Sequence, residues 1–297
     1  MIMNKPVYKL LDWIDVQKLE WYYISRNPNA IDLLTANKDK INWDCLSGNP
    51  NAIELLLENK KRINWLCLSG NPNAIQLLKA NKKKINWYHL CLNENGIELL
   101  KENLNKINWG LLSKHTAAIE LLKENKDKIN WDNLSKNNND EAIELLKENL
   151  NKIEWFNLSL NPNAIELLKA NPDKIAWQML SINKNAIELL TANQEKINWY
   201  YLCENINAIE LLKANQHKIN WNYLSLNKNA MELLRANQEK INWVGLSSNP
   251  SIFELDYKQM SINFQQLAQE IIAEALDPNR IKRLSIIYNF EFKDWFY

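Results

Sequence analysis

The stretch Lys152–Lys174 reads KIEWFNLSLNPNAIELLKANPDK, and most of the chain consists of copies of it. Tryptophan recurs with this unit at positions 21, 43, 65, 87, 109, 131, 155, 177, 199, 221 and 243. The interval is 22 residues at every step except 131 to 155, where it is 24. A fixed period in this range is typical of stacked repeats. The sequence therefore predicts an all-α fold, an α-solenoid of eleven short two-helix repeats.

Each unit carries the start signals of two short helices. The asparagine that precedes most of the tryptophans is a favourable N-cap, and the leucine three residues after each tryptophan shares its face of the helical turn. Asn161-Pro162 is typical of the start of the second helix, with asparagine as N-cap and proline at the first helical position. The body that follows, AIELLKA, presents a wide apolar face. Helices this short are marginal alone, so they must pack on neighbouring units.

An asparagine ends the second helix in every complete unit, as at Asn37 and Asn171. Asparagine is the commonest non-glycine residue in the left-handed conformation that closes helices, and the chain has only 5 glycines. We therefore expect these asparagines to adopt that conformation and to hydrogen-bond the next repeat in a ladder. The isoleucine four residues later, Ile41 in the first unit, is expected to point inward.

The repeats occupy residues 21–250 and are flanked by segments that break the period. Val7, Leu10 and Ile14 lie at helical spacing, which predicts an N-terminal helical cap over residues 1–20. Residues 251–297 are expected to form a C-terminal helical cap, with Leu267 and Ile271 on a longer amphipathic helix. Packed helices lie about 8–10 Å apart, so eleven units predict a curved rod on the order of 100 Å long.

The composition narrows the possible partners. The chain has 36 Lys+Arg against 35 Asp+Glu, so its net charge does not favour nucleic acid or a membrane surface. No apolar run is long enough to span a bilayer, and the first residues lack the apolar core of a secretion signal. Cys45, Cys67, Cys91 and Cys203 form no C-x-x-C pair, and we interpret them as small repeat residues in a reducing compartment.

Candidate catalytic residues are few. His89, His115 and His217 occupy three different repeat positions, which is not the pattern of a general base or a metal site. A recurring glutamate precedes a lysine by three residues, which favours ion pairing along the helix over a carboxylate cluster. Lys60–Arg62 and Lys82–Lys84 lie in equivalent loops and predict a local basic patch, either a solvated edge or a site for an acidic partner or a phosphate. We expect no enzyme activity, cofactor or metal.

The first, second and fifth residues after each tryptophan vary while their neighbours repeat. Constant positions maintain a scaffold and variable positions are free to recognise a partner, and tyrosine is prominent in interfaces. The alternative is that these aromatic residues merely cover the tryptophan layer. The candidate partner-binding residues are Tyr22, Tyr23, Tyr88, His89, Phe156, Tyr200, Tyr201 and Tyr223, of which we favour the last three.

The repeat LSxNPNAIELLKANxxKINW resembles the short repeats of proteins from mimivirus-like large DNA viruses of amoebae. The opening YKLLDWIDVQKLEW and the closing ALDPNRIKRL are similar to that family's flanks, although Asp277-Pro278 stands where the family has His-Pro. Asn161-Pro162 with Leu167-Leu168 is also similar to bacterial leucine-rich repeat variants, whose units alternate an α-helix with a 3₁₀-helix. The viral resemblance implies a location in the host cytoplasm or the virion.

We therefore expect a non-catalytic scaffold for protein–protein interaction, a monomer or weakly self-associating. The alternative is a structural component of the virion or viral factory that self-associates along its length.

Overall fold

The computed structural model describes residues 5–277 and 280–283, and it confirms the all-α solenoid of repeating tryptophan units. The chain divides into two compact units. One is Leu10–Phe253, which contains all the repeats, and we call it the repeat unit. The other combines the residues up to Lys9 with those from Glu254 onward, and contains the long helix α22 (Tyr257–Ala275). An amphipathic helix was expected in this region of the C-terminal segment.

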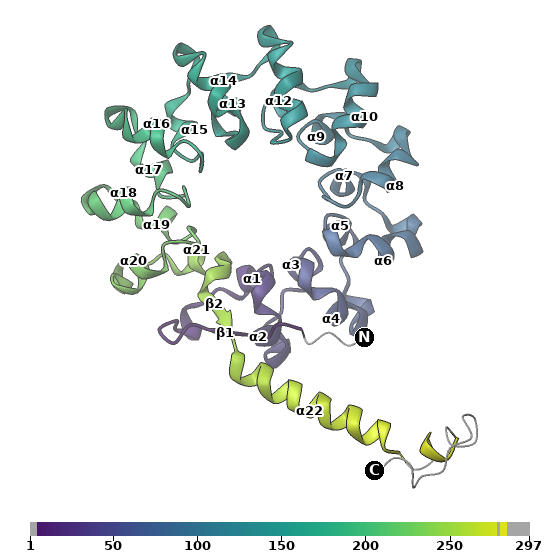
Figure 1. Cartoon of the computed structure of the whole chain (residues 1–297). Coiled ribbons are helices and arrows are strands. Elements are labelled where there is room, and N and C mark those ends of the chain that lie inside the picture. The colour runs from purple at the N-terminus through teal and green to yellow at the C-terminus, as the bar shows by residue number, and fades with distance from the viewer. Residues whose placement is uncertain (1–4, 278–279, 284–297) are drawn as a thin grey trace, which may run out of the picture. The chain divides into compact units, whose positions relative to one another are not determined.

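Each repeat contributes a first helix that starts at its tryptophan. These odd-numbered helices line the inside of the repeat unit (Figure 1). They are α1 (Trp21–Ile24), α3 (Trp43–Ser47), α5 (Trp65–Ser69), α7 (Trp87–Leu90), α9 (Trp109–Ser113), α11 (Trp131–Leu134), α13 (Trp155–Leu160), α15 (Trp177–Leu180), α17 (Trp199–Leu202), α19 (Trp221–Leu224) and α21 (Trp243–Ser248).

The second helices lie on the outside (Figure 1). These even-numbered helices are α2 (Ile31–Ala36), α4 (Ile53–Glu58), α6 (Ile75–Ala80), α8 (Ile97–Lys101), α10 (Ile119–Glu124), α12 (Asp140–Lys147), α14 (Ile165–Lys169), α16 (Ile187–Thr191), α18 (Ile209–Ala214) and α20 (Met231–Arg235). The longest, α12, lies in the 24-residue unit, so the two extra residues are absorbed at an outer helix.

Short 3₁₀-helices connect these elements. One set follows the Asn-Pro step or its equivalent: Pro28–Ala30, Pro50–Ala52, Pro72–Ala74, Thr116–Ala118, Pro162–Ala164 and Pro250–Ile252. A second set, which the sequence did not predict, precedes the next tryptophan: Val16–Lys18, Lys38–Lys40, Lys60–Arg62, Lys82–Lys84, Leu104–Lys106, Lys126–Lys128, Leu150–Lys152, Pro172–Lys174, Gln194–Lys196, Gln216–Lys218 and Gln238–Lys240.

The core runs between the inner and outer helices. In the second unit, Leu46 of α3, Ala52 at the 3₁₀ turn and Leu56 of α4 are all fully buried. Ile41 is also buried, as expected from its position. Repeating this set around the repeat unit gives one continuous apolar layer, which makes the short helices stable together although each is marginal alone.

Serine hydroxyls relay hydrogen bonds between adjacent repeats. The Ser47 hydroxyl donates to the Trp43 carbonyl at 2.8 Å and accepts from the Asn64 backbone N–H of the next repeat at 2.9 Å. Cys91 and Cys203 occupy the same repeat position, where their thiols accept from the backbone at 3.4 and 3.3 Å. Burial raises the pKa of both thiols. The interpretation of these cysteines as repeat residues is therefore supported by their contacts.

A ladder of asparagine amides joins the repeats, but it uses a different asparagine column from the one expected. The Asn49 amide donates to the Ser25 and Asn27 carbonyls of the preceding repeat at 3.1 and 2.9 Å. Its Oδ1 accepts from the Asn51 N–H at 3.0 Å, which caps the 3₁₀-helix. The column is fully or almost fully buried and consists of Asn27, Asn49, Asn71, Asn93, Asn137, Asn161, Asn183, Asn205, Asn227 and Asn249.

The asparagines that end the outer helices do not adopt the left-handed conformation, so that prediction is wrong. Asn37 has φ −132° and ψ 53°, and its amide donates to the Leu33 carbonyl of its own helix at 2.8 Å. The chain then continues into the Lys38–Lys40 3₁₀-helix, which needs no left-handed residue. These side chains close their own helix instead of bonding to the next repeat.

The repeats close into a ring (Figure 1). At the seam between the first and last units, α1 packs against α21. The Glu20 N–H donates to the Ser247 hydroxyl at 2.9 Å, and the Asn27 amide donates to the Asn249 and Ser247 carbonyls at 3.0 and 3.4 Å. These bonds repeat the serine relay and the asparagine ladder of the interior. The expectation of a rod is therefore wrong, because the small rotation at each step completes one turn over eleven units.

The tryptophans are half-buried, and cations from the following repeat cover several of them. Lys84 Nζ lies 4.4 Å from the centre of the Trp65 ring, and Lys218 Nζ lies 4.1 Å from that of Trp199. Lys18 continues the series across the seam, 5.0 Å from Trp243. Each contact joins two repeats, so these indoles contribute through cation–π interaction as well as through packing.

The described residues before Trp21 contain no α-helix, in contrast to the predicted helical cap. Strand β1 (Tyr8–Leu10) pairs with strand β2 (Phe253–Leu255) in a two-stranded sheet. The Leu11 N–H donates to the Ile252 carbonyl at 2.9 Å. Pairing with β2 thus overrides the helical spacing of the apolar residues.

Candidate interaction surface

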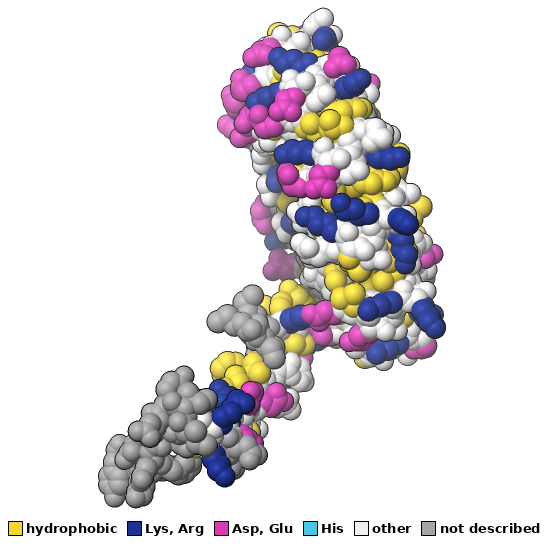
Figure 2. Space-filling view, turned by 90° about the vertical axis from the view of Figure 1, so that its right-hand side faces the viewer, with side chains coloured by type: hydrophobic (Ala, Val, Ile, Leu, Met, Phe, Trp, Pro, Cys, Tyr) yellow, Lys and Arg dark blue, Asp and Glu magenta, His cyan; other side chains and the backbone are white. Residues whose placement is uncertain are grey.

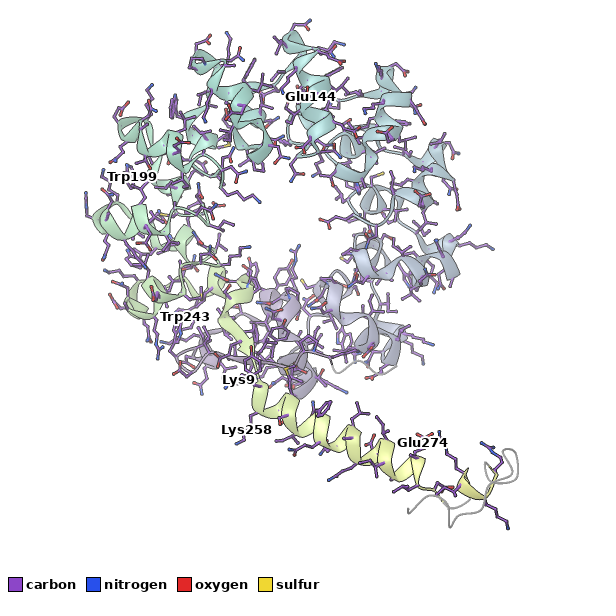
Figure 3. The ribbon with its side chains drawn as sticks, viewed as in Figure 1. Lys9, Glu144, Trp199, Trp243, Lys258 and Glu274 are labelled. Carbon is purple, nitrogen blue, oxygen red and sulfur yellow. The ribbon has the colours of Figure 1, made fainter. Side chains whose placement is uncertain are left out.

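The variable positions of the repeat lie on the odd-numbered helices, which face the centre of the ring. Figure 3 shows that the described side chains leave an opening at this centre. Several large side chains directly after the tryptophan are exposed: Tyr22 by 50%, Tyr88 by 54%, Phe156 by 46% and Tyr200 by 45%. We call this surface, formed by the first, second and fifth residues after each tryptophan, the inner wall.

The predicted site residues fall into three clusters and one isolated residue. Tyr22 contacts Tyr23 with ring centres 5.2 Å apart, and Tyr88 contacts His89 at 5.6 Å. The third cluster is Tyr200, Tyr201 and Tyr223, whereas Phe156 makes no ring contact with another described aromatic residue. Aromatic residues meet across repeats only in this third cluster, where successive units both carry tyrosine at the variable positions.

The third cluster, which we call the tyrosine triad, joins α17 to α19. The ring centres of Tyr200 and Tyr223 are 4.1 Å apart, and those of Tyr201 are 5.7 Å from Tyr200 and 6.3 Å from Tyr223. The Tyr223 hydroxyl donates a hydrogen bond to Tyr200, which raises the pKa of Tyr223 to about 12. The triad is therefore a preorganised aromatic surface, exposed most at Tyr200.

A carboxylate that the sequence analysis did not single out lies beside the triad. Glu204 follows α17 and is half-buried. Its carboxylate forms no recorded hydrogen bond or ion pair with a described residue, and burial raises its pKa. The equivalent side chain of the next repeat, Leu226, lies 3.4 Å from the Cβ position of Gly245, which corresponds to Tyr223, so the fifth residue after one tryptophan adjoins the second residue after the next. The negative charge of Glu204 accordingly contributes to the raised pKa of Tyr223. Its place as the fifth residue after Trp199 made it a variable position, but only the fold reveals its burial.

A shallow pocket of about 250 Å³ borders Glu204 on the side away from α19. Leu160, Ile182 and Ile206 supply its apolar wall, and Lys184 lies at its rim. The pocket therefore combines one carboxylate, one ammonium group and branched apolar side chains from three successive repeats.

The first cluster is tied to the scaffold more closely than the triad. A hydrogen bond from the Tyr22 hydroxyl to the Cys45 thiol raises the pKa of Tyr22, and burial raises the pKa of Cys45. This contact links two adjacent repeats. The first cluster thus fits the alternative interpretation, in which tyrosine covers the layer below it.

In the predicted basic patch, Lys60–Arg62 and Lys82–Lys84, several cations already contact other side chains of the chain. Arg62 stacks over Trp43 at 5.3 Å, Lys84 covers Trp65, and Lys82 pairs with Glu102 at 3.6 Å. Figure 2 views this side of the ring and shows lysine and arginine side chains interspersed with acidic and apolar ones. The predicted glutamate–lysine pairs on the outer helices are also present, as between Glu166 and Lys169 at 3.1 Å.

His115 replaces the ladder asparagine in the fifth unit and leaves the hydrogen bonding of the ladder incomplete there. Its Nε2 bonds to the Asn93 carbonyl at 2.8 Å, and its Nδ1 is buried without a partner. A neutral imidazole has one N–H, so it cannot serve both carbonyls that an asparagine amide serves. The signal was present in the sequence, because the other ten units carry asparagine here, but the ladder had been assigned to another column.

The substitution His115→Asn is expected to stabilise the protein by about 1–3 kcal/mol, because it supplies the missing donor and removes an unsatisfied buried atom. Urea unfolding followed by circular dichroism measures the change. His217→Asn serves as the control, since His217 is exposed and its replacement should change little. An unchanged or lower unfolding midpoint for His115→Asn would mean that the histidine is already satisfied.

Within residues 5–277 and 280–283, no group of three or more His, Cys, Asp or Glu residues is arranged to hold a metal ion. None of the described helices combines the length and apolar character needed to span a membrane. Comparisons with protein-family models, with curated proteins and with solved structures find no match for this chain.

Proposed function

We propose that the protein is a non-catalytic scaffold that binds a protein partner on the inner wall of its ring. The observation that carries this proposal is the tyrosine triad, in which three aromatic rings from two repeats meet at an exposed surface. Tyrosine supplies a large contact area with few rotatable bonds, so ordering it on binding costs little. The scaffold positions around the triad are occupied by the serine relay and the asparagine ladder, which leaves the variable positions for recognition.

The closed ring also supports a role in recognition. An open solenoid exposes an apolar face at each end, which favours stacking with further copies. Here the first and last repeats cover each other's faces through the bonds of Glu20 and Asn27. Most of the large apolar side chains that remain exposed in the described repeats lie on the inner wall, and Leu57, Leu104 and Leu150 are exposed elsewhere.

The experiment is affinity capture of partner proteins from infected host cells, with mass spectrometry as readout. The triple variant Tyr200→Ser, Tyr201→Ser and Tyr223→Ser is expected to lose at least tenfold of the captured partner, because truncating one interface hot-spot residue, a class enriched in tyrosine, costs about 2 kcal/mol or more. A matched variant, Tyr22→Ser with Tyr23→Ser, alters a cluster of similar chemistry elsewhere on the inner wall and should retain capture.

Equal capture by the triple variant and by the wild-type protein would remove the triad from the interface. Loss of capture by both variants would assign binding to the whole inner wall instead of to the triad. Circular dichroism of each variant checks that the ring is still folded.

A second candidate function is self-association through α22. Tyr257, Phe264 and Ile271 recur at seven-residue spacing on this helix and are exposed by 73%, 63% and 57%. A stripe of this period suits packing against another helix. The two candidates differ in the mass measured by light scattering, which rises with concentration only for the self-associating protein. On the resemblance of the repeat alone, we also propose a viral origin, with the protein acting in the host cytoplasm or the virion.

A further inference from the structure

We infer that Tyr200, Tyr201, Tyr223 and Glu204 form a site for a cationic side chain, a lysine or arginine, of an extended partner segment. The inference rests on the proposed function, because it names the chemistry of the partner at the same surface. The ammonium or guanidinium group of that side chain lies against the tyrosine faces and pairs with the Glu204 carboxylate.

The aromatic geometry suits a cation. The Tyr201 ring is inclined by 78° to Tyr200 and by 65° to Tyr223, so its face does not stack on either of them, whereas Tyr200 and Tyr223 pack against each other at 4.1 Å with a tilt of 53°. The separations of 4.1–6.3 Å among the three rings allow one cation to lie within about 6 Å of more than one ring centre, the range of a cation–π contact. Tyr200 is 45% exposed, which leaves the approach open.

The carboxylate supplies the charge that a purely aromatic site lacks. Glu204 is half-buried and forms no recorded ion pair with a described residue, whereas the exposed glutamates of the outer helices commonly pair with lysine. A partly desolvated carboxylate without a cation is unfavourable, and a bound cation would relieve that cost. Charge complementarity therefore selects a cationic occupant over an apolar or acidic one.

The same two repeats use this chemistry internally. Lys218 covers Trp199 at 4.1 Å, and Lys240 covers Trp221 at 4.8 Å. In the described part of the chain, no lysine or arginine lies over a ring of the tyrosine triad. Each indole here thus has its cation from the chain itself, and the tyrosines beside them are left for one from outside.

Lys184 is the other charged group at this site, and its ammonium group is the one that would compete with a partner's cation for the Glu204 carboxylate. It lines the same pocket but is exposed and forms no recorded ion pair with Glu204. Burial raises the pKa of Glu204. Removing the Lys184 ammonium should therefore leave the site available or improve its affinity for a cation.

The neighbouring pocket gives the segment a second anchor. Its apolar wall of Leu160, Ile182 and Ile206 lies next to Glu204 and has a volume of about 250 Å³, enough for one aliphatic side chain. An extended segment that places a cation at the triad could seat an apolar side chain here. Pockets for individual side chains are a general source of specificity when an extended peptide binds.

The test is a nuclear magnetic resonance titration of the full chain labelled with ¹³C-tyrosine. The probe is N-acetyl-lysine methylamide, and N-acetyl-norleucine methylamide is the neutral control of similar shape. The lysine probe is expected to shift the signals of the triad tyrosines with saturation, while the norleucine probe leaves them in place. Glu204→Gln is expected to weaken lysine-probe binding roughly three- to tenfold.

Two matched variants control the titration. Glu210→Gln removes an exposed carboxylate already paired with Lys213 at 3.1 Å, and it should leave binding unchanged. Lys184→Ala should leave binding equal or tighter. Equal shifts with both probes, no shift with either, or equal weakening by Glu204→Gln and Glu210→Gln would each overturn the cation site.

The outcome is separable from that of the proposed function. Partner capture that depends on the triad, together with no lysine-probe binding, would retain the scaffold and reject the cation site. Probe binding that depends on Glu204, together with capture that ignores the triad, would retain the cation site and reject the triad as the scaffold's interface.

Discussion

Replacement of Asn183 by alanine is expected to destabilise the protein by about 3–5 kcal/mol. The Asn183 amide donates to the Ser159 and Asn161 carbonyls at 3.1 and 2.9 Å, and its Oδ1 accepts from the Asn185 N–H at 3.0 Å. Alanine removes all three bonds at a side chain that is 1% exposed. Two buried carbonyls then lack a donor, at about 1–3 kcal/mol each, and the cap adds about 1 kcal/mol. Urea unfolding measures the loss.

Asn185→Ala is the matched control for this prediction. Asn185 belongs to the same repeat and donates a hydrogen bond of similar length, 2.9 Å, to the Pro162 carbonyl. This bond is exposed to solvent, so water can replace it, and a loss of at most about 1 kcal/mol is expected. Similar losses for the two variants would show that burial of the ladder contributes no special stability.

The same substitution at the seam distinguishes a ring from an open stack. Asn27 bonds to the Ser247 and Asn249 carbonyls, which belong to the last repeat. Asn27→Ala is therefore expected to cost nearly as much as Asn183→Ala. In an open stack the first repeat would have no preceding neighbour, and only the cap, worth about 1 kcal/mol, would be lost.

Much of the repeat could be predicted because its signals are local. Asn42 caps α3 by accepting from the Cys45 N–H at 2.9 Å, as the asparagine before tryptophan suggested. The Asn161 side chain caps the 3₁₀-helix that begins at Pro162 by accepting from the Asn163 N–H, as the Asn-Pro pair suggested. Each signal concerns residues a few positions apart, where the chemistry of the side chain decides the backbone conformation.

Closure could not be predicted because it accumulates from small steps. The rotation between Leu46 of one repeat and Leu68 of the next depends on how two fully buried side chains pack, and no short motif encodes it. The ladder was assigned to Asn37 instead of Asn27 for a related reason. Both asparagines recur in every or nearly every unit, and periodicity alone does not tell which one faces the neighbouring repeat.

The candidate surface was predicted by position but not by chemistry. Variation after the tryptophan located Tyr200, Tyr201 and Tyr223, and the structure brings these three together. The sequence favoured these three over Tyr22, but it gave no reason to expect that Tyr22 bonds to Cys45 of the next repeat. It also gave no sign that Glu204 is half-buried and unpaired, because burial and pairing depend on neighbours 22 or more residues away.

The second prediction with a large expected effect concerns the distance across the seam, measured by double electron–electron resonance. Spin labels replace Tyr22 of α1 and Val244 of α21, both exposed residues directly after a tryptophan. A matched interior pair replaces Leu66 of α5 and Tyr88 of α7, which occupy the same position in neighbouring repeats. All four native cysteines are replaced. Serine is used for Cys91 and Cys203, because other repeats carry serine at that position.

This distance tests the closed ring most directly, because a ring makes the first and last repeats neighbours and a rod separates them. The ring predicts that the Tyr22–Val244 pair gives the same distance distribution as the Leu66–Tyr88 pair, within the reach of the labels. Eleven repeats in an open stack would separate the seam pair by a distance on the order of 100 Å. A seam distance well beyond that of the interior pair would contradict closure and the assignment of an inner wall.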